Sequence, residues 1–460
     1  MKYRFNDNFL WGGAVSGPQT EGSTGKKCDS IWEYWYKKNP EKFYNEVGSV
    51  TTSDFYRKYK EYIKIMKDLN IKSYRTSIQW SRLILDREGT VDTDGVIFYN
   101  NVINELIKND IEPMMCLHHF DLPMYWMEKG GFENKETVHA FAEYADICFK
   151  LFGDRVKYWS TFNEPNIIVQ AQYLSKQHYP CVDDIKRASQ VTYNLQLASS
   201  LAIHKYKTGK YNGEIGVILN LSPVYPPSSA TKEDKIACEI VDLIFNRSFL
   251  DPSVKGEYPN ELIEFSRQEG FSPDYTKEEL NIIKQNTVDY LGANYYHPFR
   301  IKAKKIGHED SSISVEKYFD YYTFEGMKMN KHRGWEIYEK GVYDIAINIR
   351  DNYGNIPWYL AENGMGVNDE ERFINEEGII EDEYRIEFIK GHLKYLHKGI
   401  EEGSNCFGYH LWSPFDNWSW INAYKNRYGL IRVDINNNCK LSVKKSGDWF
   451  KQMVEDKGFN

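Results

Sequence analysis

The alternation of two kinds of segment constrains the fold of this chain more than any other feature of its sequence. Short runs rich in β-branched and aromatic residues predict strands at residues 9–16, 73–78, 112–120, 156–164, 214–222, 289–297, 357–364 and 406–413. Longer runs at 54–70, 99–110 and 384–403 repeat apolar residues every three or four positions, which predicts amphipathic helices. Strands as apolar as these are typical of a parallel sheet that is buried on both faces.

Eight strands that alternate with helices predict a closed parallel barrel, the α/β architecture called the (β/α)8 TIM barrel. The alternative is an open, doubly wound sheet, but no GxGxxG motif follows an early strand. The 460 residues contain no internal repeat, no low-complexity segment and no linker rich in proline, glycine and serine. Because barrels of this class often exceed the usual domain length, we expect a single domain spanning residues 1–460.

Charge and composition exclude several classes of partner. The net charge of −8, with lysines interleaved among acidic residues, argues against the basic stripe that nucleic-acid binding needs. The N-terminal segment lacks the apolar stretch of a signal peptide, and no apolar run approaches the ~18 residues of a membrane span. The seven cysteines are scattered without a CxxC pair, as is usual for thiols in a reducing compartment. We therefore predict a cytoplasmic protein without nucleic-acid or membrane partners.

Ionisable and aromatic residues gather at the predicted carboxyl ends of the strands, where parallel barrels carry their active sites. They are Arg75, His118, His119, Asn163, Glu164, Asn294, Glu362 and Trp412. Carboxylates, imidazoles and ring faces on one rim suit a sugar, whose hydroxyls need hydrogen-bond partners and whose C–H faces stack on rings.

Two glutamates at this rim predict the chemistry. Glu164 ends the fourth strand in 'TFNEP', and Glu362 ends the seventh strand in 'AENG'. Strands four and seven face each other across an eight-stranded ring, so the two side chains could flank a substrate. Glycoside hydrolysis needs one carboxylic acid to protonate the leaving oxygen and one carboxylate to attack or to activate water. The alternative is that each glutamate is only a hydrogen-bonded loop residue.

The sequence resembles glycoside hydrolase family 1 over almost its whole length. 'TFNEP' and 'ENG' are similar to the family's acid/base and nucleophile signatures. The segments 'FLWGGAVSGPQTEG', 'YRTSIQWSR', 'LHHFDLP', 'LGANYYHP', 'RGWEIYEKG' and 'GYHLWSPFDN' appear in the family's order. One departure is Ala361, where the family usually has Thr or Ser before the nucleophile. The resemblance implies a catalytic barrel that hydrolyses β-glycosides with retention of configuration, without a metal or another cofactor.

The resemblance also implies the catalytic roles. Glu164 is expected to be the general acid/base and Glu362 the nucleophile. Arg75 and Tyr296 are expected to hold Glu362 in its ionised form, because a cation and a phenol donor favour the charged state. The apolar sequence neighbours of Glu164, which are Trp159 and Phe162, are expected to raise its pKa as an acid requires.

The substrate-binding residues that the resemblance implies are Gln19, His119, Asn163, Asn294, Tyr296, Trp335, Trp412 and Trp420. Asn163 is expected to bind the sugar 2-hydroxyl, and Gln19 and His119 the 3- and 4-hydroxyls. Trp412 is expected to stack beneath the ring, and Trp335 to line the aglycone side. For four residues near these positions a packing role is the alternative: His118, Trp80, Trp126 and Asn294.

The segment after the eighth strand indicates a phosphorylated substrate. In 'DNWSWINAYKNRYG', Ser419 stands where ordinary family members carry a glutamate that accepts hydrogen bonds from the sugar's 4- and 6-hydroxyls. A carboxylate there would repel a 6-phosphate by roughly 4 kcal/mol per charge at 4 Å in an effective dielectric of 20. The segment is similar to the phosphate loop of the family's 6-phospho-β-glycosidases, so Ser419, Lys425 and Tyr428 are expected to bind the phosphate. Many relatives have the lysine at the position of Asn426, which leaves open which of the two neighbours makes the contact.

The predicted activity is that of a 6-phospho-β-glucosidase, which would cleave substrates such as cellobiose 6-phosphate to glucose 6-phosphate and an aglycone by double displacement. A tryptophan at the position of Trp420 also occurs in 6-phospho-β-galactosidases, which are the first alternative. Further alternatives are a β-glucosidase for unphosphorylated sugars, an inverting hydrolase, and a non-catalytic sugar-phosphate-binding protein. Loops around 168–182 and 300–335 are expected to form the aglycone pocket. The sequence predicts neither the specificity of that pocket nor the oligomeric state.

Overall fold

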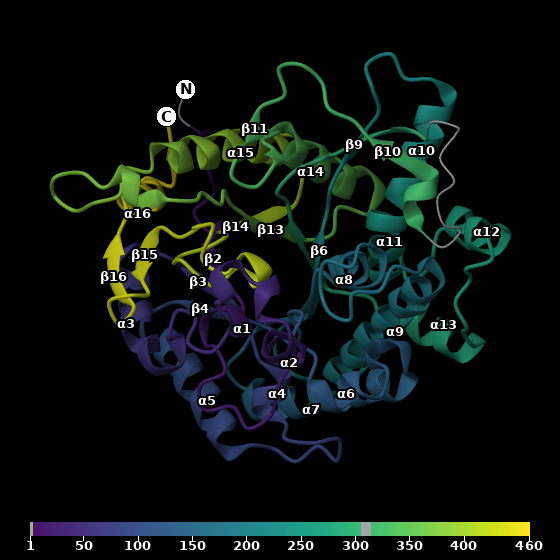
Figure 1. Ribbon diagram of the computed structural model, residues 1–460, viewed down its shortest axis with the longest axis horizontal. Coiled ribbons are helices and arrows are strands. Elements are labelled where there is room, and N and C mark those ends of the chain that lie inside the picture. Colours follow the sequence, from purple (N-terminus) through teal and green to yellow (C-terminus); the bar gives the residue numbers. More distant parts are fainter. Residues whose placement is uncertain (1–2, 305–313) are drawn as a thin grey trace.

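The structure is a computed structural model that describes residues 3–304 and 314–460. Its centre is a closed barrel of eight parallel strands, arranged around the ring in the order in which the chain forms them (Figure 1). The strands are β2 (Leu10–Ala14), β3 (Ser73–Ser77), β4 (Glu112–Cys116), β5 (Tyr158–Asn163), β6 (Glu214–Asn220), β8 (Tyr290–Asn294), β13 (Trp358–Asn363) and β14 (Cys406–Leu411). Every predicted strand is confirmed, and the ring closes where β14 pairs with β2.

Helices surround the barrel (Figure 1). The longer ones are α2 (Ile31–Lys38), α3 (Phe55–Asp68), α5 (Thr93–Lys108), α7 (Lys135–Phe152), α9 (Ile185–Gly209), α10 (Lys232–Asp242), α11 (Ser248–Val254), α12 (Asn260–Gln268), α13 (Lys277–Gln285), α14 (Lys340–Asn352), α15 (Glu383–Glu401) and α16 (Lys445–Glu455). The three predicted helices correspond to α3, α5 and α15. Helix α5 begins at Thr93, earlier than predicted, because the side chain of Asp92 accepts a hydrogen bond from the Asp94 N–H and caps it.

The remaining strands and helices are short and are not part of the barrel. The additional strands are β1 (Tyr3–Arg4), β7 (Val224–Tyr225), β9 (Phe299–Ala303), β10 (Phe319–Tyr321), β11 (Met329–Asn330), β12 (Trp335–Glu336), β15 (Ile431–Asp434), β16 (Lys440–Val443) and β17 (Gly458–Phe459). The short α-helices are α1 (Gly17–Thr20), α4 (Trp80–Leu83), α6 (Met124–Met127) and α8 (Pro165–Val169). Single helical turns of other types lie at Pro40–Lys42, Tyr44–Glu46, Gly131–Glu133, Gln170–Leu174, Leu243–Arg247, Val315–Tyr318, Glu370–Phe373 and Trp420–Asn422.

The inside of the barrel is packed with side chains. A separate buried cluster is contributed by four strands, and it consists of Met114, Ile218, Tyr290, Tyr359 and Ala361. The main core lies outside the ring, between strands and helices, as where Phe162 of β5 stacks on Phe141 of α7 with ring centroids 4.4 Å apart. Because the interior is filled, a substrate can bind only beyond the strand ends, where the parallel strands direct their last residues to one rim.

None of the helices in the described segments combines the length and the apolar character that a membrane span needs.

Candidate active site

A cavity of about 510 Å³ lies at the carboxyl ends of the barrel strands. The predicted site residues that line it are Gln19, His119, Glu164, Tyr296, Trp335, Glu362, Trp412, Ser419, Trp420 and Tyr428. Arg75, Asn163 and Asn294 are buried behind this lining and reach it through hydrogen bonds. The structure therefore brings the two glutamates into one cavity, together with most of the residues expected to bind the sugar.

Glu362, near the end of β13, is held at both carboxyl oxygens. Nη2 of Arg75 donates to Oε1, and the hydroxyl of Tyr296 donates to Oε2 at 2.6 Å. Arg75 is fully buried on β3, where burial opposes its charge and the neighbouring Glu362 raises its pKa. A buried guanidinium and a phenol are donors that a carboxylate anion accepts strongly, so Glu362 is oriented as an anion.

Glu164 stands at a sharp turn between β5 and α8. Its backbone adopts the left-handed conformation with φ 49°, and Pro165 begins the helix at the next residue. The Glu164 N–H donates to the carbonyl oxygen of Ile218 at 2.7 Å, which ties this turn to β6. A non-glycine residue in this conformation costs about 1–3 kcal/mol, so the surrounding structure holds the turn that directs the side chain into the cavity.

The described residues donate hydrogen bonds to only one oxygen of the Glu164 carboxyl group. Nδ2 of Asn220 and Nδ2 of Asn294 each donate to Oε1 at 2.9 Å. Burial, followed by the negative charge of Glu362, raises the pKa of Glu164 to about 7, while the two amide hydrogen bonds oppose this rise. Oε2 is thus the oxygen available to carry a proton toward a bound substrate.

The raised pKa of Glu164 agrees with the prediction, and burial is its largest cause. The two apolar neighbours named for it pack against helix α7: the ring of Trp159 lies edge-on to Phe149 at 5.0 Å, and Phe162 stacks on Phe141. The negative charge of Glu362 is a second cause, which was not predicted.

A chain of polar contacts connects the surroundings of the two glutamates. Nη1 of Arg75 lies 3.2 Å from Nδ1 of His119, whose Nε2 lies 3.2 Å from Nδ2 of Asn163. Asn294 donates to Oδ1 of Asn163 at 3.2 Å and also to Glu164. Burial, followed by the charge of Arg75, lowers the pKa of His119 well below its usual value, so its imidazole is neutral. These side chains hold one another in place before any substrate is bound.

The side of the cavity expected to hold the sugar is rigid and aromatic. Nε2 of Gln19 donates to the carbonyl oxygen of Trp418 at 2.8 Å, and its Oε1 accepts from Ser16 Oγ at 2.7 Å. The ring of Trp412 lies 6.0 Å from that of His119 at an interplanar angle of 28°. Trp420 stacks on the buried Trp32 with centroids 4.4 Å apart.

The opposite side of the cavity is formed by the loops expected to receive the aglycone. Trp335 lies against Tyr296 and His297, with ring centroids 5.4 Å and 5.2 Å apart. The loops also contribute Gln170, Ala171, Gln177, His178, Arg300, Tyr321, Tyr322, Thr323, Met327, Met329 and Gly334. Residues 305–313 of the second loop lie outside the described residues.

The residues expected to bind a phosphate are only partly brought together. Ser419 and Tyr428 both line the cavity, and Tyr428 packs in one small cluster with Trp412. Lys425 is exposed and does not line the cavity; its Nζ lies 5.6 Å from the ring centroid of Tyr44. Asn426 is buried, and its Nδ2 donates to the carbonyl oxygen of His332 at 3.4 Å. A phosphate contact by Lys425 stays a prediction that this placement does not support.

Three of the residues with an alternative packing role lie outside the cavity lining. His118 is surrounded by the rings of Phe132 and Phe162, and burial lowers its pKa to about 3. Trp80 stacks on Tyr144 at 4.9 Å, and Trp126 lies beside Trp80. These placements favour packing for all three, whereas the fourth residue, Asn294, contacts Glu164 directly.

Two residues of the site were not recognised from the sequence. Asn220 ends β6 and donates to Glu164, and its position at a strand end was the available signal. Arg333 opens the segment 'RGWEIYEKG' and lines the cavity, although only Trp335 of that segment was singled out.

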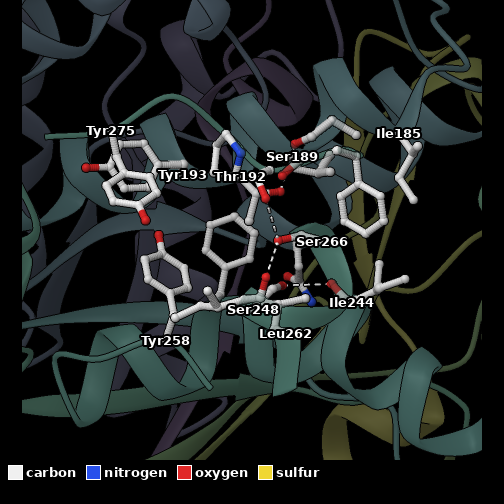
Figure 2. A pocket seen from close by; sticks show the side chains of 18 of the residues that line it. Ile185, Ser189, Thr192, Tyr193, Ile244, Ser248, Tyr258, Leu262, Ser266 and Tyr275 are labelled. Carbon is white, nitrogen blue, oxygen red and sulfur yellow. Dashed lines mark hydrogen bonds between the residues drawn. The ribbon is translucent and has the colours of Figure 1, made fainter. Parts of the chain in front are cut away.

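A second cavity, of about 330 Å³, lies away from the barrel axis among α9, α11, α12 and α13 (Figure 2). Tyr258 and Tyr275 lie at one end of it and Ile185 at the other (Figure 2). None of the described residues that line this cavity is a carboxylate. The described lining therefore lacks the pair of carboxyl groups that glycoside hydrolysis needs. In the described part of the chain, no group of three or more His, Cys, Asp or Glu side chains is arranged to hold a metal ion.

Two glutamates at facing strand ends of a closed barrel, one held as an anion and one with a raised pKa, define the site of a glycoside hydrolase. The sequence model described as Glycosyl hydrolase family 1 matches residues 1–459. The chain belongs to glycosyl hydrolase family 1.

The names of its relatives differ in whether they specify a phosphorylated substrate. The chain is 54% identical to 6-phospho-beta-glucosidase GmuD of Bacillus subtilis (strain 168), with 100% of this chain and 99% of the relative covered. It is 35% identical to a 6-phospho-beta-galactosidase of Clostridium acetobutylicum, with 98% and 97% covered. Among solved structures, beta-glucosidase from Thermotoga maritima in complex with glucoimidazole matches with a TM-score of 0.91 at 32% identity, covering 99% of this chain and 100% of that chain.

Proposed function

We propose that this protein is a retaining 6-phospho-β-glucosidase that releases glucose 6-phosphate from 6-phospho-β-D-glucosides. The observation that carries the proposal is the pair Ser419 and Tyr428, two hydroxyl donors that line the sugar end of the cavity. Ser419 replaces the glutamate that would repel a phosphate. The described carboxylates that line the cavity are the two catalytic glutamates and Glu336, which Arg300 binds through two hydrogen bonds of 2.8 and 2.9 Å. The relative at 54% identity is a 6-phospho-beta-glucosidase, which also supports this substrate class.

In the first step Glu362 attacks the anomeric carbon while Glu164 protonates the leaving oxygen. With a pKa of about 7, a large fraction of Glu164 carries the required proton at neutral pH. The attacking carboxylate is already oriented by Arg75 and Tyr296, so little reorganisation accompanies the formation of the glycosyl-enzyme.

In the second step Glu164 acts as the base. Formation of the ester removes the negative charge of Glu362, which is the second largest cause of the raised pKa of Glu164. The pKa of Glu164 therefore falls, and its carboxylate can accept a proton from the attacking water. One residue thus serves both half-reactions because its partner changes charge between them.

We place this activity in the cytoplasm, in a single catalytic domain that spans residues 1–460. All seven cysteines are free thiols, which supports a reducing compartment. The substrate would be a small phosphorylated β-glycoside, and the site calls for no cofactor, nucleic acid or membrane.

Hydrolysis of p-nitrophenyl β-D-glucoside 6-phosphate and of its unphosphorylated counterpart tests the proposal. We expect kcat/KM to be at least about 100-fold higher for the phosphorylated substrate, because two or more charge-assisted hydrogen bonds contribute about 1.5–3 kcal/mol each. Similar values for both substrates would remove the phosphate from the proposal and leave a β-glucosidase.

A 6-phospho-β-galactosidase is the second candidate function. Two observations favour it: Trp420 lines the sugar end of the cavity, and a 6-phospho-beta-galactosidase is 35% identical to this chain. The galacto-configured 6-phosphate substrate, assayed in parallel, decides between the two. A higher kcat/KM for the galactoside would overturn the preference for glucose.

A further inference from the structure

A phosphate dianion at the sugar end needs a cationic partner as well as hydroxyl donors. Among the described residues that line the cavity, the permanent cations are Arg300 and Arg333. The guanidinium of Arg300 already binds Glu336 through two hydrogen bonds. Arg333 has no carboxylate within 4.0 Å among the ion pairs of the described residues, so its charge is available to a ligand.

Arg333 is held in a defined position on the turn between β11 and β12. Its N–H donates to the carbonyl oxygen of Asn330 at 3.2 Å, and its guanidinium lies 4.3 Å from the ring centroid of Trp335. Nε of Arg333 is buried and has no hydrogen-bond partner in the described structure. A stacked guanidinium with an unused buried donor is prepared to bind an anion bidentately.

The turn that carries Arg333 is hydrogen-bonded to two other segments, one at Gly366 and one at Asn426. Nδ2 of Asn330 donates to the carbonyl oxygen of Gly366 at 3.1 Å, and Nδ2 of Asn426 donates to that of His332 at 3.4 Å. His332 also contacts Asn368 through Nδ1. The positive charge of Arg333 acts on the Tyr428 hydroxyl as well: burial raises the pKa of Tyr428, and Arg333 is the largest opposing influence.

We propose that Arg333 is the cation that binds the 6-phosphate, beside Ser419 and Tyr428, and that Asn426 positions it through the His332 carbonyl. The proposal rests on the proposed function and identifies the specificity-determining charge of that site. It also gives the exposed Lys425 no part in binding.

The test compares Arg333→Gln with Lys425→Gln, which removes the same charge from an exposed residue outside the cavity lining. Both variants are assayed with p-nitrophenyl β-D-glucoside 6-phosphate and with p-nitrophenyl β-D-glucoside, and glucose 6-phosphate is used as a competitive inhibitor. We expect Arg333→Gln to raise KM for the phosphorylated substrate and Ki for glucose 6-phosphate by about 10- to 150-fold, the loss of one charged hydrogen-bond partner. We expect Lys425→Gln to change either by less than about 3-fold.

Thermal unfolding serves as the folding control, and the melting temperature should change by no more than about 2 °C in both variants. Asn426→Ala should raise KM for the phosphorylated substrate with little change in kcat, as expected of a positioning residue. An unchanged preference of Arg333→Gln for the phosphorylated substrate, or a loss of preference in Lys425→Gln, would overturn the inference. If the unaltered enzyme shows no such preference, the proposed function itself fails, and that result is visible before any variant is measured.

Discussion

At the scale of single residues, the two glutamates that we propose as catalytic are chemically different because their donors differ. Glu362 receives a cation and a phenol, one on each oxygen, whereas Glu164 receives two neutral amides on the same oxygen. Neutral donors moderate the effect of burial without cancelling it, so the pKa of Glu164 stays near 7. This difference in donors is the reason why we assign the role of acid to Glu164 and that of nucleophile to Glu362.

Substitution of Asn220 tests how the acidity of Glu164 is set. The hydrogen bond from Asn220 lowers the pKa of Glu164, so Asn220→Ala should raise it and shift the basic limb of kcat/KM, near pH 7 in the parent, to higher pH. Profiles between about pH 5 and 9 measure the shift. The substrate phosphate titrates near pH 6 identically for both enzymes, so the difference between them reports the enzyme. A limb that stays in place or moves to lower pH would contradict this account.

The leaving group separates the roles of Glu164 and Glu362. Glu362→Gln should lower kcat by about 10⁴-fold or more for every substrate, because it removes the nucleophile. Glu164→Gln should retain a rapid first step with a dinitrophenyl glycoside, whose leaving group needs no proton, and should then accumulate the glycosyl-enzyme. Burst kinetics and intact-protein mass spectrometry detect that species. Accumulation in Glu362→Gln instead would reverse the two assignments.

The sequence was sufficient for the residues that carry chemistry in short motifs, and insufficient for those that act only through the fold. Glu164 and Glu362 lie in segments whose residue types already suit an acid and a nucleophile. Asn220 acquires its role by lying beside β5, and the direction of Lys425 depends on a loop conformation that no local pattern determines.

At the scale of elements, the segment after β14 depends on a buried network of charges beneath it. Arg385 of α15 donates to the carbonyl oxygens of Met365 and Tyr428 at 2.6 and 3.0 Å and to Asp382 at 2.9 Å. Lys444 reaches Asp416 at 3.0 Å. Since these charges are almost fully buried, each relies on its partners for stabilisation.

Removal of the Arg385 charge should therefore affect both stability and binding. Arg385→Gln leaves the buried carboxylate of Asp382 without its cation, so we expect the free energy of unfolding to fall by about 3–5 kcal/mol. We also expect a higher KM for the phosphorylated substrate, because Tyr428 loses a backbone anchor. Urea denaturation and kinetics at reduced temperature measure the two effects. Arg372→Gln is the matched control: this partly exposed residue of the preceding loop should change stability by no more than about 0.5 kcal/mol.

Most barrel strands were predictable because they are short runs of apolar residues, as in β13; β3 (SYRTS) is the exception, since it is buried although most of its residues are polar. The strands between β8 and β13 were not predicted. β9 pairs with β7 and β10, and β11 pairs with β12; all of these strands are short and lie outside the barrel, so their pattern is not that of a buried strand. The chain between β8 and β13 carries Arg333 and Trp335, which explains why these two parts of the site were the least predictable.

At the scale of the whole molecule, the filled barrel and the covering helices bury most of the thiols. Cys116, Cys148, Cys238, Cys406 and Cys439 are buried, and only Cys28 and Cys181 are partly accessible. Burial raises the pKa of both accessible thiols, which also slows their reaction.

A thiol titration tests this arrangement of cysteines. At most two thiols should react with a disulfide reagent under native conditions, and all seven in denaturant. Cys28→Ser with Cys181→Ser should leave no fast-reacting thiol. Rapid modification of a third thiol in that double variant would contradict the described packing, and fewer than seven thiols in denaturant would indicate a disulfide.

The complete burial of Arg75 has a consequence for the lifetime of the covalent intermediate. When Glu362 becomes an ester, the guanidinium keeps its positive charge but loses its counter-ion, and water cannot reach it to compensate. The unpaired buried charge therefore raises the free energy of the glycosyl-enzyme, and hydrolysis removes this cost by regenerating the Glu362 anion. Arg75 therefore favours hydrolysis of the Glu362 ester, and the residue that orients the nucleophile also shortens the lifetime of the covalent intermediate.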